Sequence, residues 1–255
     1  MSDYDRYANS RYGAGIARSG AAVDQGLRAY MIGVYNYMTL GLGVTGLVAY
    51  AAFQFGTVQT EAGRLMLTDF GRAIYVSPLR WVIVLAPLGV VFYISARINS
   101  MSVASARNWF IAFAALIGLS MSALLVIYTH GSIARAFFAT AAGFASLSLY
   151  GYTTQRSLSA MGSFLSMGVI GLIVAMLLNM FLHSTGLQFA ISIIGVLIFA
   201  GLTAWDTQAI KEMYYAGDSY EMAQKKSING ALRLYLDFIN MFQFLLMLTG
   251  SQRNN

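Results

Sequence analysis

The sequence contains no cysteine and only two prolines, and just 10% of its 255 residues are charged. The lack of cysteine excludes disulfide scaffolds, zinc fingers, iron–sulfur sites and thiol catalysis by this chain. A soluble domain carries about 25% charged residues, so this chain has too few charges to cover a water-soluble particle of its size. Hydrophobic residues make up 58% of the sequence. The composition therefore indicates a membrane protein, for which the lipid bilayer is the main partner.

The formal net charge of +6 does not indicate a nucleic-acid-binding protein. The basic residues cluster on no soluble domain, and an excess of Lys and Arg is expected in the cytoplasmic loops of membrane proteins. We therefore expect no nucleic-acid partner.

Long uncharged stretches predict the membrane spans, each of which needs about 20 apolar residues. Six such spans are predicted at residues 29–60, 81–96, 108–134, 136–155 and the two halves of 157–205, which the turn residues 183–186 divide. A seventh stretch, 228–249, carries Arg233 and Asp237. Each central charge costs about 2.5–3.5 kcal/mol on the insertion scale, so this helix needs protein or water around its polar side. We predict an all-α membrane protein with seven transmembrane helices.

Basic residues predict the orientation. With the N-terminus in the cytoplasm, ten Lys and Arg residues lie on the cytoplasmic side and five on the other side, which agrees with the positive-inside rule. Residues 1–28 contain no apolar core, so we expect a cytoplasmic polar tail rather than a signal peptide. Residues 29–250 then form the transmembrane domain, and residues 251–255 a short C-terminal tail.

Two of the ten carboxylates, Asp206 and Asp237, lie inside predicted spans. An ionisable residue at membrane depth indicates a functional site. If the sixth span ends near Ile210 and the seventh begins near Asn229, Asp206 lies about 6 Å and Asp237 about 12 Å from the same membrane face. Both carboxylates are therefore expected in the cytoplasmic half of the bilayer.

The two carboxylates share helix faces with other polar residues. These faces are Thr203, Asp206, Thr207 and Ile210 on the sixth span, and Arg233, Asp237, Asn240 and Phe244 on the seventh. Two carboxylates in a low dielectric cannot both ionise cheaply, so we expect the pair to share a proton, and to attract a hard cation such as calcium when deprotonated.

A plainer alternative stays open. Asp237 could pair with Arg233 one turn earlier on the same helix, and Asp206 could cap its helix or pair with Lys211. Neither carboxylate would then have a function beyond structure.

An intramembrane aspartyl protease would also need two aspartates on adjacent spans. Such enzymes pair Tyr-Asp with Gly-x-Gly-Asp and carry a later Pro-Ala-Leu motif. Here the aspartates follow Trp205 and Leu236, and no proline occurs after Pro87. We therefore expect no enzymatic activity.

Residues 204–210 (AWDTQAI) and 234–242 (LYLDFINMF) resemble the two signatures of the transmembrane Bax inhibitor motif family, in the form found in bacteria. The resemblance covers roughly residues 20–250. It implies seven helices, six of them around a central polar seventh, and a location in the bacterial inner membrane.

The resemblance also implies an activity, a pH-sensitive calcium leak in which Asp206 and Asp237 sense protons, line the ion path and bind calcium transiently. Arg97 matches the family's arginine latch, which holds one of the aspartates and closes the cytoplasmic end. Arg233, Asn240, Thr203 and Thr207 are candidate modulators, and no resident cofactor is implied.

A second function from a different class also follows from the resemblance. Bacterial relatives are associated with a membrane-bound ATP-dependent protease, and animal relatives with cell-survival control. The chain could thus be a non-conducting regulator, with the polar tail as its interaction segment.

Overall fold

The computed structural model describes the backbone of residues 3–61 and 64–253, and the side chains from Gln25 onward within that range. The ends of the two predicted tails, residues 1–2 and 254–255, lie outside the described residues. The described chain forms α1 (Asp3–Gly56), β1 (Thr57–Gln59), β2 (Leu65–Leu67), α2 (Asp69–Tyr75), α3 (Leu79–Arg97), α4 (Val103–Ile127), α5 (His130–Thr153), α6 (Ser159–Leu182), α7 (Thr185–Glu212) and α8 (Tyr220–Thr249).

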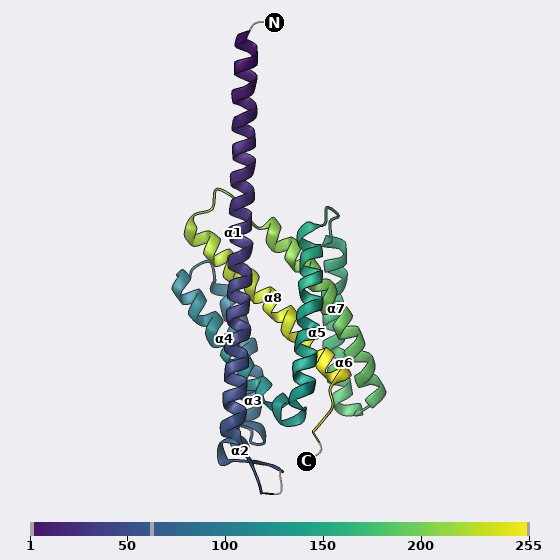
Figure 1. Ribbon diagram of the computed structural model, residues 1–255. Helices are drawn as coiled ribbons and strands as arrows, with labels where there is room; N and C mark the ends of the chain where they lie inside the picture. Colours follow the sequence, from purple (N-terminus) through teal and green to yellow (C-terminus); the bar gives the residue numbers. More distant parts are fainter. Residues whose placement is uncertain (1–2, 62–63, 254–255) are drawn as a thin grey trace.

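Seven of these helices are long and apolar enough to cross a membrane, and the seventh predicted span is among them. The prediction of an all-α protein with seven transmembrane helices is confirmed. The strands β1 and β2 form a small antiparallel hairpin between α1 and α2. Figure 1 shows α1 extending well beyond the bundle at one end. We call this end the tail end; the connections α3–α4, α5–α6 and α7–α8 also lie there.

Polar caps rather than charges set the helix boundaries. The predicted break at residues 183–186 is confirmed: His183 ends α6 in the left-handed conformation (φ 50°), and the Ser184 hydroxyl accepts the Leu187 amide hydrogen at the start of α7. The predicted boundary at Arg135 is wrong. Thr129 caps the start of α5 through the Ser132 amide, so Arg135 lies inside that helix.

The predicted start of the last span near Asn229 is also wrong. Ser219 caps α8 at its true start by accepting from the Met222 amide, so the helix begins nine residues earlier, at Tyr220. Residues of the polar tail likewise belong to a helix, because α1 is continuous from Asp3 into the first span.

Helix α8 has the largest buried share of the seven spans, and it packs against α1, α4, α5 and α7. It runs obliquely across the bundle (Figure 1). This burial fits the polar character of the helix, since Lys225 and Asp237 have protein rather than lipid around them. The wrapping of six helices around α8 stays a prediction.

The residues after α8 form a strap against the connection between α4 and α5. Thr129 donates its amide hydrogen to the Ser251 carbonyl (N–O 3.1 Å), and Arg253 donates to the Ile127 carbonyl (2.8 Å). The Ser251 amide in turn donates to the Ser132 hydroxyl (3.0 Å). The strap therefore lies at the bundle end opposite the tail end, and we call that end the strap end.

Candidate functional site

Asp206 lies on α7, six residues before the helix ends at Glu212. Its side chain is buried, as are those of Thr203, Thr207 and Ile210 on the same face. The face that the sequence marks as polar therefore points into the protein.

Asp237 lies on α8 and is only 4% exposed. Asp237 and Asp206 line the same cavity, so the structure brings their carboxyl groups to one site. One oxygen of Asp237, Oδ2, is buried and has no hydrogen-bond partner among the described residues. The pair faces a cavity of about 380 Å³ between α6, α7 and α8, whose other walls are mostly apolar. Two carboxyl groups thus meet at membrane depth, and one of them keeps an unused acceptor.

Arg233 supplies the positive charge nearest to the pair. Its Nη1 lies 3.4 Å from Asp206 Oδ1, so the ion pair joins α8 to α7. This distance is long for a charge-assisted hydrogen bond, which typically measures about 2.7–2.9 Å. The guanidinium side chain is 44% exposed. Arg233 is therefore a loosely held neighbour, with one side at the cavity.

The plainer pairings of the two aspartates do not form among the described residues. Lys211 donates its Nζ hydrogen to the Tyr152 carbonyl (2.8 Å) instead of reaching Asp206. Arg233 pairs across helices with Asp206 instead of with Asp237 on its own helix. The two carboxyl groups therefore lie in one cavity together with Arg233, which pairs with Asp206.

The structure does not bring Arg97 to the pair. Its side chain is exposed at the end of α3. No ion pair or side-chain hydrogen bond of the described residues joins it to Asp206 or Asp237. The role of Arg97 as a latch stays a prediction.

The candidate modulators divide into two kinds. The hydroxyl groups of Thr203 and Thr207 donate to carbonyls of their own helix, and Thr207 also bonds to Ser148 of α5 (2.9 Å). Asn240 donates to the Leu236 carbonyl (2.8 Å) and lines the cavity. Of the four candidates, only Arg233 and Asn240 line the carboxylate cavity.

Two further cavities adjoin the carboxylate cavity. Toward the tail end, a cavity of about 460 Å³ shares Arg233 and Leu236 with it and includes Lys225 and Lys226. Toward the strap end, a cavity of about 550 Å³ shares Met176 and includes His183 and Gln188. The three cavities therefore follow one another along α8 from one end of the bundle to the other.

Sequence reasoning did not identify the two lysines of the tail-end cavity as site residues. Both are held in place: Lys225 pairs with Glu221 (2.9 Å) and Lys226 with Asp218 (2.6 Å). The four-residue spacing of Glu221 and Lys225 is a signal that could have indicated a helix there. It would also have moved the start of α8 to its observed position.

The described residues contain no group of three or more His, Asp or Glu side chains that could hold a metal ion. A transient contact with calcium would thus rest on Asp206 and Asp237.

This chain is similar to known proteins over most of its length. The sequence model of the family described as Inhibitor of apoptosis-promoting Bax1 matches residues 27–254. A protein of Rickettsia prowazekii is 46% identical over 231 residues, which cover 91% of this chain and 93% of the relative. A protein of Caulobacter vibrioides is 43% identical over 256 residues, 99% of this chain and 100% of the relative. The inner membrane protein YbhL of Escherichia coli is 41% identical over 230 residues, 89% of this chain and 94% of the relative. With its seven apolar helices, the chain is a multi-pass membrane protein.

Proposed function

Because this chain belongs to the Bax inhibitor family, we propose that it is a pH-sensitive calcium leak channel gated by protonation of Asp206 and Asp237. The observation that carries the proposal is the meeting of these two buried carboxyl groups in one cavity. A hard cation prefers oxygen ligands, and the deprotonated pair supplies four oxygens. A shared proton removes part of that negative charge and weakens the attraction.

The arrangement of the cavities supports a path for the ion. The carboxylate cavity shares lining residues with a cavity at each end of the bundle. Only Arg233 and Leu236 are common to the carboxylate cavity and the tail-end cavity. A gate at these two side chains would control passage between the carboxylates and the tail end.

Movement of α3 is the proposed gating motion. Val91 and Ser95 of this helix, and Ile98 just after it, line the tail-end cavity together with residues of α8. A displacement of α3 would therefore change the width of the cavity. In the proposed closed state Arg97, at the end of α3, hydrogen-bonds to the aspartate pair.

The proposed location is the inner membrane, with the tail in the cytoplasm. The relative YbhL is named as an inner membrane protein. The ten basic residues that flank the spans on the tail side, against five on the other, support this orientation.

The test is a flux measurement in liposomes loaded with a calcium dye. The protein is reconstituted as the parent, Asp206→Asn, Asp237→Asn and, as a matched control, Asp69→Asn, which changes an exposed aspartate on α2. We expect flux through the parent and the control to rise as the pH rises and the pair loses its proton. Flux through the two site variants is expected to vary little with pH. Site variants that follow the parent's pH profile would refute the proposed sensor.

A second candidate function is that of a non-conducting regulator of a membrane-bound ATP-dependent protease or of a cell-survival pathway. The extension of α1 beyond the bundle favours it (Figure 1), because the extension offers a surface away from the membrane spans. Pull-downs from native membranes with the full chain and with a variant lacking residues 1–24 test this function. Loss of a partner with unchanged calcium flux would show that the tail binds a partner independently of conduction, and equal recovery from both proteins would exclude the tail as the binding segment.

A further inference from the structure

A hollow lies between α1 and α5 near the tail end, away from the two aspartates. It measures about 590 Å³ and is lined by Arg28, Met31, Ile32, Tyr35, Phe144, Ala145, Ser148, Leu149 and Tyr152. Its uncharged polar side chains are Tyr152 and the pair of Tyr35 and Ser148, which hydrogen-bond to each other across the two helices (2.5 Å). This hollow thus has one charged lining residue, Arg28, and a mainly apolar wall.

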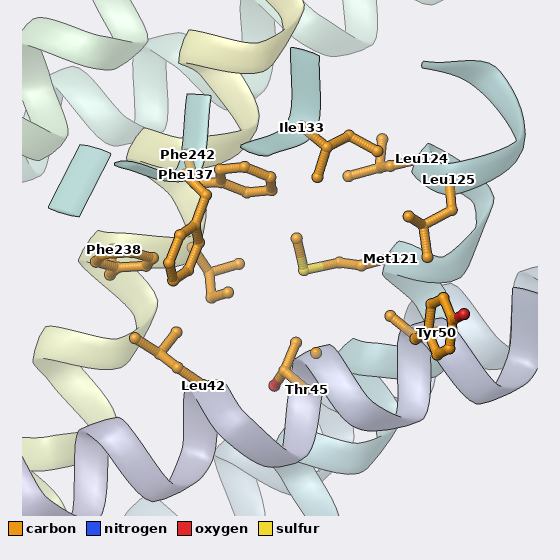
Figure 2. A pocket seen from close by; sticks show the side chains of 13 residues that line it. Leu42, Thr45, Tyr50, Met121, Leu124, Leu125, Ile133, Phe137, Phe238 and Phe242 are labelled. Atoms are coloured by element: carbon orange, nitrogen blue, oxygen red, sulfur yellow. The ribbon is translucent and has the colours of Figure 1, made fainter. Parts of the chain in front are cut away.

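A second cavity lies farther along the same two helices. It measures about 280 Å³, and residues of α1, α4, α5 and α8 enclose it. Figure 2 shows the rings of Phe137, Phe238 and Phe242 on one side, Leu42 and Thr45 on the other, and Met121 reaching in between. Its size exceeds the engineered apolar cavity of about 150 Å³ that binds benzene. The cavity is therefore large enough for part of an apolar ligand.

A row of phenylalanine rings connects the two spaces. Phe144 lines the first hollow, and its ring centroid lies 5.5 Å from that of Phe238. Phe238 and Phe137 line the second cavity, and their centroids are also 5.5 Å apart. Both contacts are edge-on, a favourable arrangement for aromatic rings. The hollow and the cavity thus share an aromatic floor, and we call the whole feature the α1–α5 groove.

Among the described residues that line the groove, the positive charge lies at its tail end. Arg28 is exposed at its mouth. Lys211 does not line the hollow, although its Nζ lies 5.7 Å from the centroid of the Tyr152 ring, which does. No acidic side chain lines the hollow or the cavity among the described residues. A basic mouth and an apolar interior are the features that bind the head group of an anionic lipid and its hydrocarbon chain.

We propose that the α1–α5 groove binds one anionic phospholipid of the leaflet at the tail end. Its phosphate lies against Arg28, and one acyl chain follows the aromatic floor into the cavity of Figure 2. The length agrees: fourteen residues of helix separate Arg28 from Leu42, about 21 Å. Half of a bilayer, head group included, is also about 20–22 Å thick. The acyl chain is therefore long enough to enter the cavity beside Leu42, one helical turn before Gly46.

Glycines of α1 provide matched variants. Gly46 lines the cavity, and a side chain added there meets no atom within 4 Å. Gly46→Leu therefore adds an apolar side chain to the cavity, with open space around its Cβ position. Gly43, three residues earlier, has the same open surroundings but lines neither space, so Gly43→Leu is the control. For the head group, Arg28→Gln is compared with Arg107→Gln, which changes an exposed arginine at the tail end of α4.

Native mass spectrometry of the full chain in detergent, with added phosphatidylglycerol or phosphatidylcholine, tests the proposal. We expect one retained phosphatidylglycerol per chain and weaker retention of phosphatidylcholine. Arg28→Gln should weaken phosphatidylglycerol binding about fivefold, the effect of one surface cation on an anionic lipid. Gly46→Leu should weaken both lipids, while Arg107→Gln and Gly43→Leu should match the parent.

Three results would overturn the proposal. One is equal retention of the two lipids by the parent, which would indicate unspecific lipid around the bundle. Another is unchanged phosphatidylglycerol binding in Arg28→Gln. The third is unchanged binding in Gly46→Leu, because an acyl chain in the cavity cannot coexist with the added leucine. Melting temperatures of all four variants without lipid show that each is folded before its binding is compared.

Discussion

Arg233 of α8 reaches across to Asp206 of α7, with Nη1 3.4 Å from Oδ1, although Asp237 lies one turn along its own helix. The cation therefore lies beside one carboxyl group of the pair, while Oδ2 of the other has no partner within the part of the chain that the structure describes. The positive charge is thus distributed unevenly over the two carboxyl groups. Substitutions of Arg233 and of Asp237 should therefore have different effects.

Removal of Arg233 should strengthen calcium binding. In the Arg233→Gln variant, the carboxylate pair loses the cation that lies beside Asp206, so an incoming calcium ion meets more net negative charge. We expect the calcium concentration for half-maximal flux to fall about five- to tenfold, which corresponds to a gain of ~1–1.4 kcal/mol in binding free energy. Calcium titrations in liposomes measure it, with Arg107→Gln as the control. A weaker response to calcium in Arg233→Gln would contradict an inhibitory role for this arginine.

Replacing Asp237 with leucine should stabilise the fold while removing function. No described residue donates a hydrogen bond to the buried Oδ2 atom, and a buried unpaired acceptor costs about 1–3 kcal/mol. Leucine fills a similar space without that cost, and the ion pair of Asp206 with Arg233 remains. We expect the free energy of unfolding to rise by about 1 kcal/mol and the pH response of the flux to disappear. Asp237→Asn keeps a polar group there, so it should lose the pH response of the flux without a rise in the free energy of unfolding. A lower melting temperature for Asp237→Leu would refute this reasoning.

The hydroxyl groups of Tyr235 and Thr45 hydrogen-bond to each other at 2.6 Å, and this bond joins α8 to α1. Tyr235 is fully buried, so no water replaces a lost partner. We expect Tyr235→Phe to lower the free energy of unfolding by about 1 kcal/mol. Tyr220→Phe, at an exposed position, should have no effect. A double-mutant cycle with Thr45→Val measures the coupling; additive effects would mean that the bond contributes nothing.

Gly151 sets the distance between α5 and α7. A side chain there would collide with the Ala204 backbone carbonyl, two residues before Asp206. Gly151→Leu should therefore push α7 away, lower the melting temperature by several degrees and reduce calcium flux. Gly143→Leu, on the same helix but with open space around it, should leave both unchanged. Measurements of both variants side by side separate a packing effect from a general effect of leucine.

The number of spans and the two buried aspartates followed from the sequence because uncharged runs and isolated charges are local features. The break near His183 was predictable since turn residues interrupt an apolar run. The boundary at Arg135 was wrong because an arginine can lie in the first turns of a helix, whereas Thr129 carries the capping hydroxyl.

The partner of Arg233 could not be predicted. Its choice between Asp206 and Asp237 depends on the rotation of α8 against α7, which residues of other helices determine. The depth estimate for Asp237 also rested on a helix start near Asn229. With α8 beginning at Tyr220, Asp237 lies about 26 Å along its helix. The oblique course of α8, which brings it back to Asp206, is visible only in three dimensions (Figure 1).

The strap after α8 has a mechanical consequence. Its backbone bonds run between Ser251–Arg253 and the turn at residues 127–129, and the Ser132 hydroxyl adds another bond. A force applied to the C-terminus loads these bonds before it reaches α8. Helix α8, which carries Asp237, can therefore be pulled out from the C-terminal end only after the strap has detached from the α4–α5 turn. The strap thus fastens the last helix to the connection between α4 and α5, near one face of the membrane.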